Sequence, residues 1–238
     1  VIFFVSGMTL VGAAVGGLFL KEAPDENQIQ RRGGKDLLLA AFETFKTDRN
    51  FRRLAVIAAL FGMYLTLFPH YQRLGRDRLD LGLSALIPWV LAQNIGAALF
   101  SIPTGWLADR YGNRLVLQLI MVVLCVAPVL ALAISWGAEL QPAWFTVVFG
   151  LLGLTPVAMR FLNNYTLEIV SRDEHPRYLS TLAFAIAAPP ILLSPLVGAL
   201  IDSVGFELIF AIVTGCVFTG WLLTFTLAEP RKLSAGSQ

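Results

Sequence analysis

A chain of 238 residues that is 56% hydrophobic and only 14% charged carries more apolar side chain than a soluble domain of this length can bury. The mean hydropathy of +0.70 therefore indicates a protein that crosses the membrane several times. Neither the net charge of +2 nor the two cysteines, which both lie in apolar runs, indicates nucleic-acid binding, a disulfide framework, a bound metal or a cofactor.

Seven stretches are long and apolar enough to cross a bilayer as helices, because a span needs about 20 mostly apolar residues. The chain begins at Val1 inside the first of them, without a methionine, a basic leader or a cleavage site. We therefore expect a fragment of a longer protein. The predicted spans are 1–20, 54–72, 84–108, 115–136, 143–166, 180–200 and 206–228.

A basic segment, 21–53, separates the first predicted span from the others. Its later part, 36–46, has the pattern of a short amphipathic helix that lies on the membrane surface. A solvated linker is the alternative interpretation of the same residues.

Lysine and arginine gather on one side of the membrane when the loops are assigned to alternate sides. The other side receives only Arg73, Arg76 and Arg78, and Arg160 lies within a span. Because positive residues are retained in the cytoplasm, we expect the linker 21–53 and the tail 229–238 on the cytoplasmic side of a cell membrane. The richer side receives Lys21, Arg31, Arg32, Lys35, Lys46, Arg49, Arg52, Arg53, Arg110, Arg114, Arg172, Arg177, Arg231 and Lys232.

The segment 105–114 places three charges and two glycines between two apolar runs. Its glycines permit a tight turn, in which Gly112 is free to adopt a positive φ. The pattern G-x-x-x-D-R-x-G-x-R resembles the signature loop of the major facilitator superfamily of secondary transporters. The matching positions are Gly105, Asp109, Arg110, Gly112 and Arg114.

This resemblance implies an all-α membrane protein whose transmembrane bundle has two six-helix halves. Residues 1–20 would be the sixth span, 21–53 the linker between the halves, and 54–228 the C-terminal six-helix domain. The N-terminal five spans would be missing. In this superfamily the third and sixth helices of each half are peripheral, and the other helices line the transport path.

An internal repeat supports the same organisation. The spacing G-x-L-x-D-x-x-G-x-x-L at 105–115 recurs at 198–208, three spans later. Three is an odd number, so the second copy lies on the opposite side of the membrane, and it has no arginines. An inverted three-plus-three repeat is the organisation expected within one half of such a transporter.

Polar residues within the spans are candidates for the transport path, because uncompensated polar groups in hydrocarbon are costly. Gln93 and Asn94 fall near mid-bilayer, where solute sites of this fold lie. Asn163 and Asn164 are weaker candidates, since helix–helix hydrogen bonding also explains them. His70 could carry a coupling proton or serve as an interfacial anchor.

Arg160 is the one charge set deep in a predicted span. It could be a cavity cation that binds an anionic solute group or partners a proton-carrying acid. It could equally extend to the interface and pair with Glu168 or with helix-end carbonyls. The prolines of 180–200 predict an interrupted span, which would be either a gating element or a static kink.

We expect a secondary transporter that moves a small solute by alternating access, and that has a proton as a possible coupling ion. No acidic residue lies well inside a predicted span, so a coupling carboxylate would belong to the missing half, or the protein is not proton-coupled. A membrane receptor or scaffold that no longer transports is the alternative. An intramembrane enzyme is disfavoured, because the spans contain no paired acids, metal ligands or nucleophile–base pair.

Overall fold

The computed structural model of the chain describes residue 12 and residues 43–137 and 142–229. All of these except Gly12 belong to the unit Leu37–Gln238, which is described below. The predicted span 1–20 lies outside the described residues, apart from Gly12, which is helical. Of the predicted surface helix at 36–46, only residues 43–46 are described, and they are helical.

Six helical segments of the described residues are long and apolar enough to span a membrane, as predicted for the region after the linker. The first begins at Arg49, earlier than the predicted start at 54, because the Asp48 carboxylate accepts hydrogen bonds from the backbone N–H groups of Asn50 and Phe51. The six segments are Arg49–Leu79, Leu86–Tyr111, Asn113–Trp136, Phe145–Ile169, Arg172–Val204 and Phe206–Thr224.

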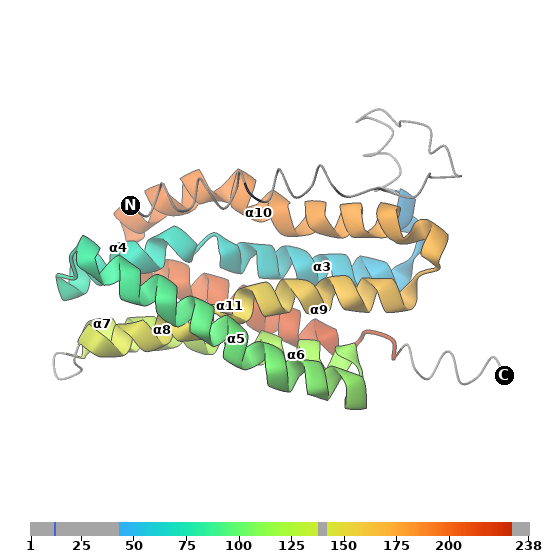
Figure 1. Cartoon of the computed structure of the whole chain (residues 1–238). Helices are drawn as coiled ribbons and strands as arrows, with labels where there is room; N and C mark the ends of the chain where they lie inside the picture. Colours follow the sequence, from blue (N-terminus) through green and yellow to red (C-terminus); the bar gives the residue numbers. More distant parts are fainter. Residues whose placement is uncertain (1–11, 13–42, 138–141, 230–238) are drawn as a thin grey trace. The chain divides into compact units, whose positions relative to one another are not determined.

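The helices run up and down in one bundle (Figure 1). Short 3₁₀ turns at Leu83–Ala85, Pro142–Trp144 and Arg172–Glu174 precede α5, α8 and α10. In chain order the helices are α3 (Arg49–Leu65), α4 (Phe68–Leu79), α5 (Leu86–Tyr111), α6 (Asn113–Leu124), α7 (Val126–Trp136), α8 (Phe145–Leu152), α9 (Leu154–Ile169), α10 (His175–Val204) and α11 (Phe206–Thr224).

Three of the spans are divided into two helices, and each division falls four residues before a proline. Proline has no N–H to offer the carbonyl four residues earlier, and its ring clashes with that carbonyl, so the helix ends there. The divisions follow Leu65, Leu124 and Leu152, which precede Pro69, Pro128 and Pro156.

The prediction that prolines interrupt the span 180–200 is wrong, because α10 continues unbroken past Pro189, Pro190 and Pro195. Pro190 leaves the Ile186 carbonyl without its usual N–H partner. Gly62 of α3 lies directly against that carbonyl, in a contact too close for any side chain. A packed neighbour can thus hold a proline-containing membrane helix on its course.

The two halves of the repeat pack through matching helix crossings. The first span of each set of three crosses the second span of the other set: α3 packs on α10, and α8–α9 packs on α5. Both crossings are made through glycine, at Gly62 in the first and at Gly96 and Gly153 in the second. Small residues at such crossings let the two backbones approach closely. This arrangement confirms the inverted repeat that the sequence predicts.

The turns that carry the repeated motif lie at opposite ends of the bundle (Figure 1). One joins α5 to α6 through Gly112, and the other joins α10 to α11 through Gly205. We name these two ends of the bundle the Gly112 end and the Gly205 end.

A closed ring of hydrogen bonds holds the Gly112 end together. The Asn50 amide nitrogen donates to the Tyr165 hydroxyl (3.2 Å), which donates to the Ala228 carbonyl (2.7 Å). The Ala228 N–H donates in turn to the Asn50 amide oxygen (2.9 Å). The Arg53 guanidinium adds a hydrogen bond to the Thr226 carbonyl (2.6 Å). The chain after α11 is therefore bound to both α3 and α9.

We expect Asn50→Ala to lower the free energy of unfolding by about 1–3 kcal/mol, because the half-buried Ala228 N–H loses its acceptor. Thr47→Ala is the control, since the Thr47 hydroxyl is exposed and binds only the Glu43 carbonyl within its own helical turn. Thermal unfolding of the purified protein measures both variants. An equal, small change in the two would show that the ring contributes nothing to stability.

Candidate functional site

The signature turn has a backbone that only glycine adopts readily. Gly112 has φ 94° and ψ 158°, ends α5 with an N–H···O bond to the Ala108 carbonyl (2.8 Å), and starts α6. Gly205 has φ 88° and ψ 168° and makes the equivalent bond to the Ile201 carbonyl (3.0 Å). The positive φ predicted for Gly112 is confirmed, and the two copies of the motif form the same turn.

The arginines of the signature turn contact aromatic rings and a helix end. The guanidinium carbon of Arg110 lies 5.6 Å from the ring centroids of both Trp106 and Tyr111, which is within cation–π range. Arg114 donates to the Phe225 carbonyl (2.8 Å) just after α11. The Asp109 side chain is exposed at the end of α5.

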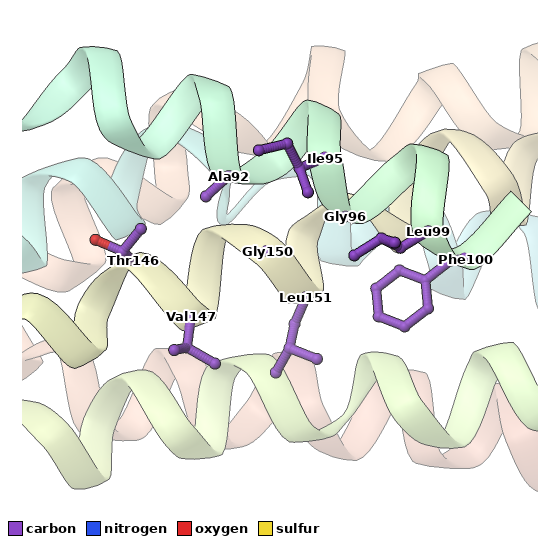
Figure 2. A pocket seen from close by; sticks show the side chains of 9 residues that line it. All are labelled: Ala92, Ile95, Gly96, Leu99, Phe100, Thr146, Val147, Gly150 and Leu151. Carbon is purple, nitrogen blue, oxygen red and sulfur yellow. The ribbon is translucent and has the colours of Figure 1, made fainter.

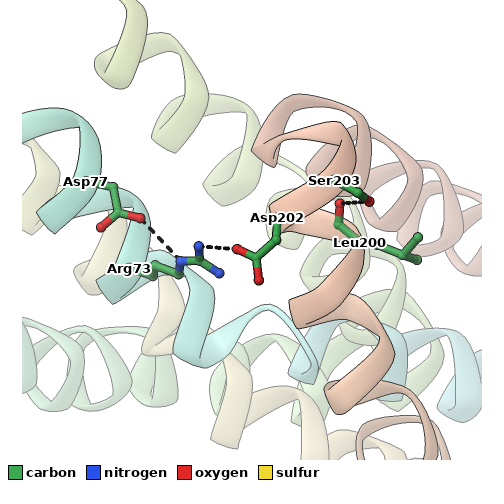
Figure 3. Close-up of polar contacts among 5 residues, drawn as sticks. All are labelled: Arg73, Asp77, Leu200, Asp202 and Ser203. Atoms are coloured by element: carbon green, nitrogen blue, oxygen red, sulfur yellow. Dashed lines mark hydrogen bonds and ion pairs between the residues drawn. The ribbon is translucent and has the colours of Figure 1, made fainter.

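At the Gly205 end the second copy of the motif is neutralised by arginines of α4. Figure 3 shows Arg73 between Asp77 of its own helix (3.2 Å) and Asp202 of α10. Arg78 pairs with Glu207 at 2.8 Å. These pairs are largely exposed, so each contributes little stability, but together they hold α4 against the α10–α11 turn.

Arg114 and Glu207 occupy the same position of the repeat, two residues after Gly112 and Gly205. Each binds the far end of the other peripheral span: Arg114 binds the Phe225 carbonyl after α11, and Glu207 accepts from the indole N–H of Trp136 at the end of α7 (3.2 Å). The contact is therefore conserved within the repeat while the charge is reversed.

The structure separates the adjacent candidates Gln93 and Asn94. Gln93 is half-buried, and its backbone carbonyl lies against Gly153 in the α5–α9 crossing. Asn94 is exposed, and its amide donates to the Val90 carbonyl one turn earlier (2.8 Å).

The α9 candidates lie close together on one helix. Arg160 and Asn163 are exposed and Asn164 is half-buried. Among the described residues none of these three side chains makes a hydrogen bond or ion pair, and the pairing of Arg160 with Glu168 that we considered is not formed. Helix α9 contacts α5, α6 and α10, and Figure 1 shows it between α10 and α5.

Asn94 and Arg160 do not form one cluster. Helices α5 and α9 belong to spans that run in the same direction, and Gly96 is level with Gly150 where they meet. Counted from these glycines at 1.5 Å per residue, Asn94 lies roughly 18 Å nearer the Gly205 end than Arg160. Arg160 is level with Trp106, near the Gly112 end of α5.

His70 lies at the crossing of α4 and α10, away from both groups. It is 8% exposed, and its ring lies 3.7 Å from the position that a Cβ on Gly198 would occupy. Its packing fits the anchor interpretation better than a place on an open path.

A groove of about 430 Å³ between α5 and α8 contains none of the predicted site residues. Figure 2 shows that apolar side chains line it, with Thr146 as the exception. Its α5 side includes Ile95 and Leu99, which are 50% and 64% exposed. With so few polar groups, this groove offers nothing that would orient a polar solute.

Three buried hydroxyls inside the bundle were not predicted from the sequence. Tyr64, Tyr71 and Thr155 are at most 5% exposed; the Tyr64 and Tyr71 hydroxyls interact with each other, and the Thr155 hydroxyl has no hydrogen-bond partner among the described residues. Tyr64 and Tyr71 flank the break between α3 and α4, where Pro69 has divided the helix. A tyrosine on each side of a span-breaking proline was the signal available in the sequence.

Two observations define the class of protein. Six membrane-capable helices form one bundle, and a repeated glycine turn lies at its two opposite ends. Among the described residues there is no group of three or more His, Cys, Asp or Glu side chains placed to hold a metal ion. The fold is therefore that of a multi-pass helical membrane protein built from an inverted repeat.

The sequence profile of the Major Facilitator Superfamily matches residues 79–238, which is more than half of the chain. The chain thus belongs to the Major Facilitator Superfamily. A search of the curated proteins found no match. Members of this superfamily are in general transporters of small molecules rather than enzymes, and they reside in lipid membranes.

Proposed function

We propose that the chain is the C-terminal part of a secondary active transporter that moves a small solute by alternating access. The observation that carries the proposal is the pair of identical glycine turns, at Gly112 and Gly205, at opposite ends of an inverted repeat. In transporters whose halves are built from such inverted repeats, the two halves rock against each other around a fixed site. The second half would be the N-terminal five spans together with residues 1–20, joined through the linker 21–53.

The exposed faces of the bundle support this assignment. Within the apolar membrane-spanning stretch of α5 only 11% of the residues are buried, and within that of the α10 span only 17% are. The corresponding share for the α3–α4 span is 61%. In α5 the exposed side carries the polar Asn94 among large apolar side chains such as Leu99 and Ile102. Such a face fits the second half and the path between the halves. A receptor or scaffold that no longer transports remains the alternative function.

The test uses single cysteines at two depths of the proposed path, in the full-length protein with Cys125 and Cys216 replaced by serine. Asn94→Cys lies toward the Gly205 end and Asn163→Cys toward the Gly112 end. Alternating access predicts that a transported solute changes the reactivities of the two cysteines toward an impermeant maleimide in opposite directions. Reactivities that never change in opposition would contradict transport and favour the receptor.

We expect Asp109→Asn to shift the equilibrium away from the state that is closed at the Gly112 end. Asp109 lies in the last turn of α5, where the helix dipole disfavours an anion, and it already has a partner within this half. Arg114 across the turn is one group that would offset the dipole, and we propose that a helix N-terminus of the other half adds a second attraction in the closed state. Losing about 1 kcal/mol of that attraction corresponds to a roughly fivefold shift in the equilibrium. The Asn163→Cys reporter should then react faster and solute uptake should slow, at normal expression. Wild-type reactivity and uptake would exclude this role.

The positive-inside bias leads us to propose that the Gly112 end faces the cytoplasm. We expect Lys35→Cys, in the same cysteine-free background, to react with an impermeant maleimide only after the cells are opened. Gly82→Cys, in the exposed loop between α4 and α5, is the matched position on the other side and should react in intact cells. The reverse pattern would invert the proposed orientation.

A further inference from the structure

Arg160 has no partner and does not lie at the end of a helix. The other arginines in and beside the membrane-spanning helices have at least one of these two features, a partner or a position at a helix end. Arg53 and Arg114 bind carbonyls after α11, and Arg73 and Arg78 bind carboxylates. Arg160 lies nine residues before the end of α9, roughly 14 Å into the span, and makes no hydrogen bond, ion pair or cation–π contact in the described part of the chain.

An interfacial anchor should look different from Arg160. About one turn nearer the Gly112 end, Arg110 shows what an anchored arginine does, since it lies over the rings of Trp106 and Tyr111. Arg160 could bind neither Glu168 nor helix-end carbonyls in the arrangement observed. Its guanidinium is exposed on the side of α9 that the neighbouring helices leave open.

Along α9 no acidic residue lies within a turn of Arg160, and the acidic residues of the described chain lie at helix ends or in loops. Asn163 and Asn164, one turn away, have amide groups without partners and add further hydrogen-bond donors. A guanidinium with neighbouring amide N–H groups is the set of donors that a carboxylate or phosphate requires.

We propose that the transported solute is an organic anion, and that its carboxylate or phosphate pairs with Arg160 where the path opens toward the Gly112 end. This inference rests on the proposed transport function. The planar guanidinium can give two parallel N–H···O bonds to one anionic group, while Asn163 supplies a further donor to the same group or to its neighbour. Gln93 and Asn94, farther along the path, would then meet the solute at a different stage of transport.

The test measures binding by thermal unfolding of the full-length protein in nanodiscs of phosphatidylcholine alone. Benzoate, succinate and glucose 6-phosphate are compared with their uncharged counterparts benzamide, succinamide and glucose. We expect at least one anion to raise the Tm by roughly 3 °C while its uncharged counterpart does not. Arg160→Gln should abolish this shift, and Arg160→Lys should weaken binding about tenfold, because lysine keeps the charge but loses the two-pronged geometry.

Arg172→Gln is the matched control, since Arg172 is an exposed arginine of the loop before α10 and should leave the shift intact. The inference is overturned if no anion raises the Tm, if the uncharged counterpart raises it equally, or if Arg160→Gln keeps the shift. It is also overturned if only added phosphatidylglycerol gives an Arg160-dependent shift, because the ligand is then a lipid headgroup. Anion binding without opposed cysteine reactivities would instead reject the transport function and leave an anion receptor.

Discussion

Gly96→Ala is expected to reduce the folded fraction of the protein and its stability, whereas Gly105→Ala in the same helix should leave both unchanged. A Cβ on Gly96 would collide with the Gly150 carbonyl group, whose carbon lies 2.9 Å from that position. The obstacle is backbone, which cannot rotate away, so α5 and α8 must separate. Overpacking of a tight core costs about 1–3 kcal/mol, and we expect the upper end of that range here.

Gly105 provides the control because no heavy atom lies within 4 Å of its Cβ position. Fluorescence-detected size-exclusion chromatography of detergent extracts measures the folded fraction, and thermal unfolding measures its stability. Gly105→Ala should give wild-type values in both. If Gly96→Ala matches Gly105→Ala, the α5–α8 crossing is looser than the structure indicates.

The second large effect is expected at the repeated turns. Gly112→Ala and Gly205→Ala should each lower the free energy of unfolding by about 1–3 kcal/mol, because a side chain is strained at φ 94° or 88° with an extended ψ. The two losses should be similar, since the backbone conformations match although the charges around them differ.

Gly82→Ala is the control for these turns, because Gly82 has no positive φ and only the Ser84 hydroxyl lies within 4 Å of its Cβ position, at 3.9 Å. Thermal unfolding of the purified variants measures all three. A loss at Gly112 alone would mean that the arginine-bearing turn is special for its charges rather than for its backbone. A loss at neither turn would contradict the strain argument.

The sequence predicted the spans and the repeat because both depend on local properties. Hydropathy depends on composition within a window, and the tight turns depend on glycine at fixed spacing. The six spans and the positive φ of Gly112 were therefore accessible without coordinates.

Features that depend on a neighbouring helix could not be predicted from the sequence. Pro69 divides its span, but Pro190 does not, because Gly62 of a distant segment covers the carbonyl that Pro190 leaves free. No local pattern contains that information. The ring formed by Asn50, Tyr165 and Ala228 likewise joins three segments that are far apart in sequence.

The candidate site shows the same limit at the scale of one residue. Gln93 and Asn94 are adjacent in sequence, yet a helix turns about 100° between them, so one faces the α9 crossing and the other is exposed. The sequence identified polar residues within spans, but it could not determine which of them face open space. Arg160 was identified from its depth alone, and its lack of a partner needed the coordinates.

The exchange of Arg114 for Glu207 at one repeat position has a consequence for how such a protein arises. The turn geometry is the same in both copies, so a three-helix unit with neutral ends could fold equally well in either direction across a bilayer. The direction in which such a unit inserts into the membrane would then not be determined during synthesis. Arginines added to one copy would favour one direction of insertion without altering the backbone. In a protein with such a repeat, a few arginines at one turn can bias orientation, while the glycines keep the two turns in the same conformation.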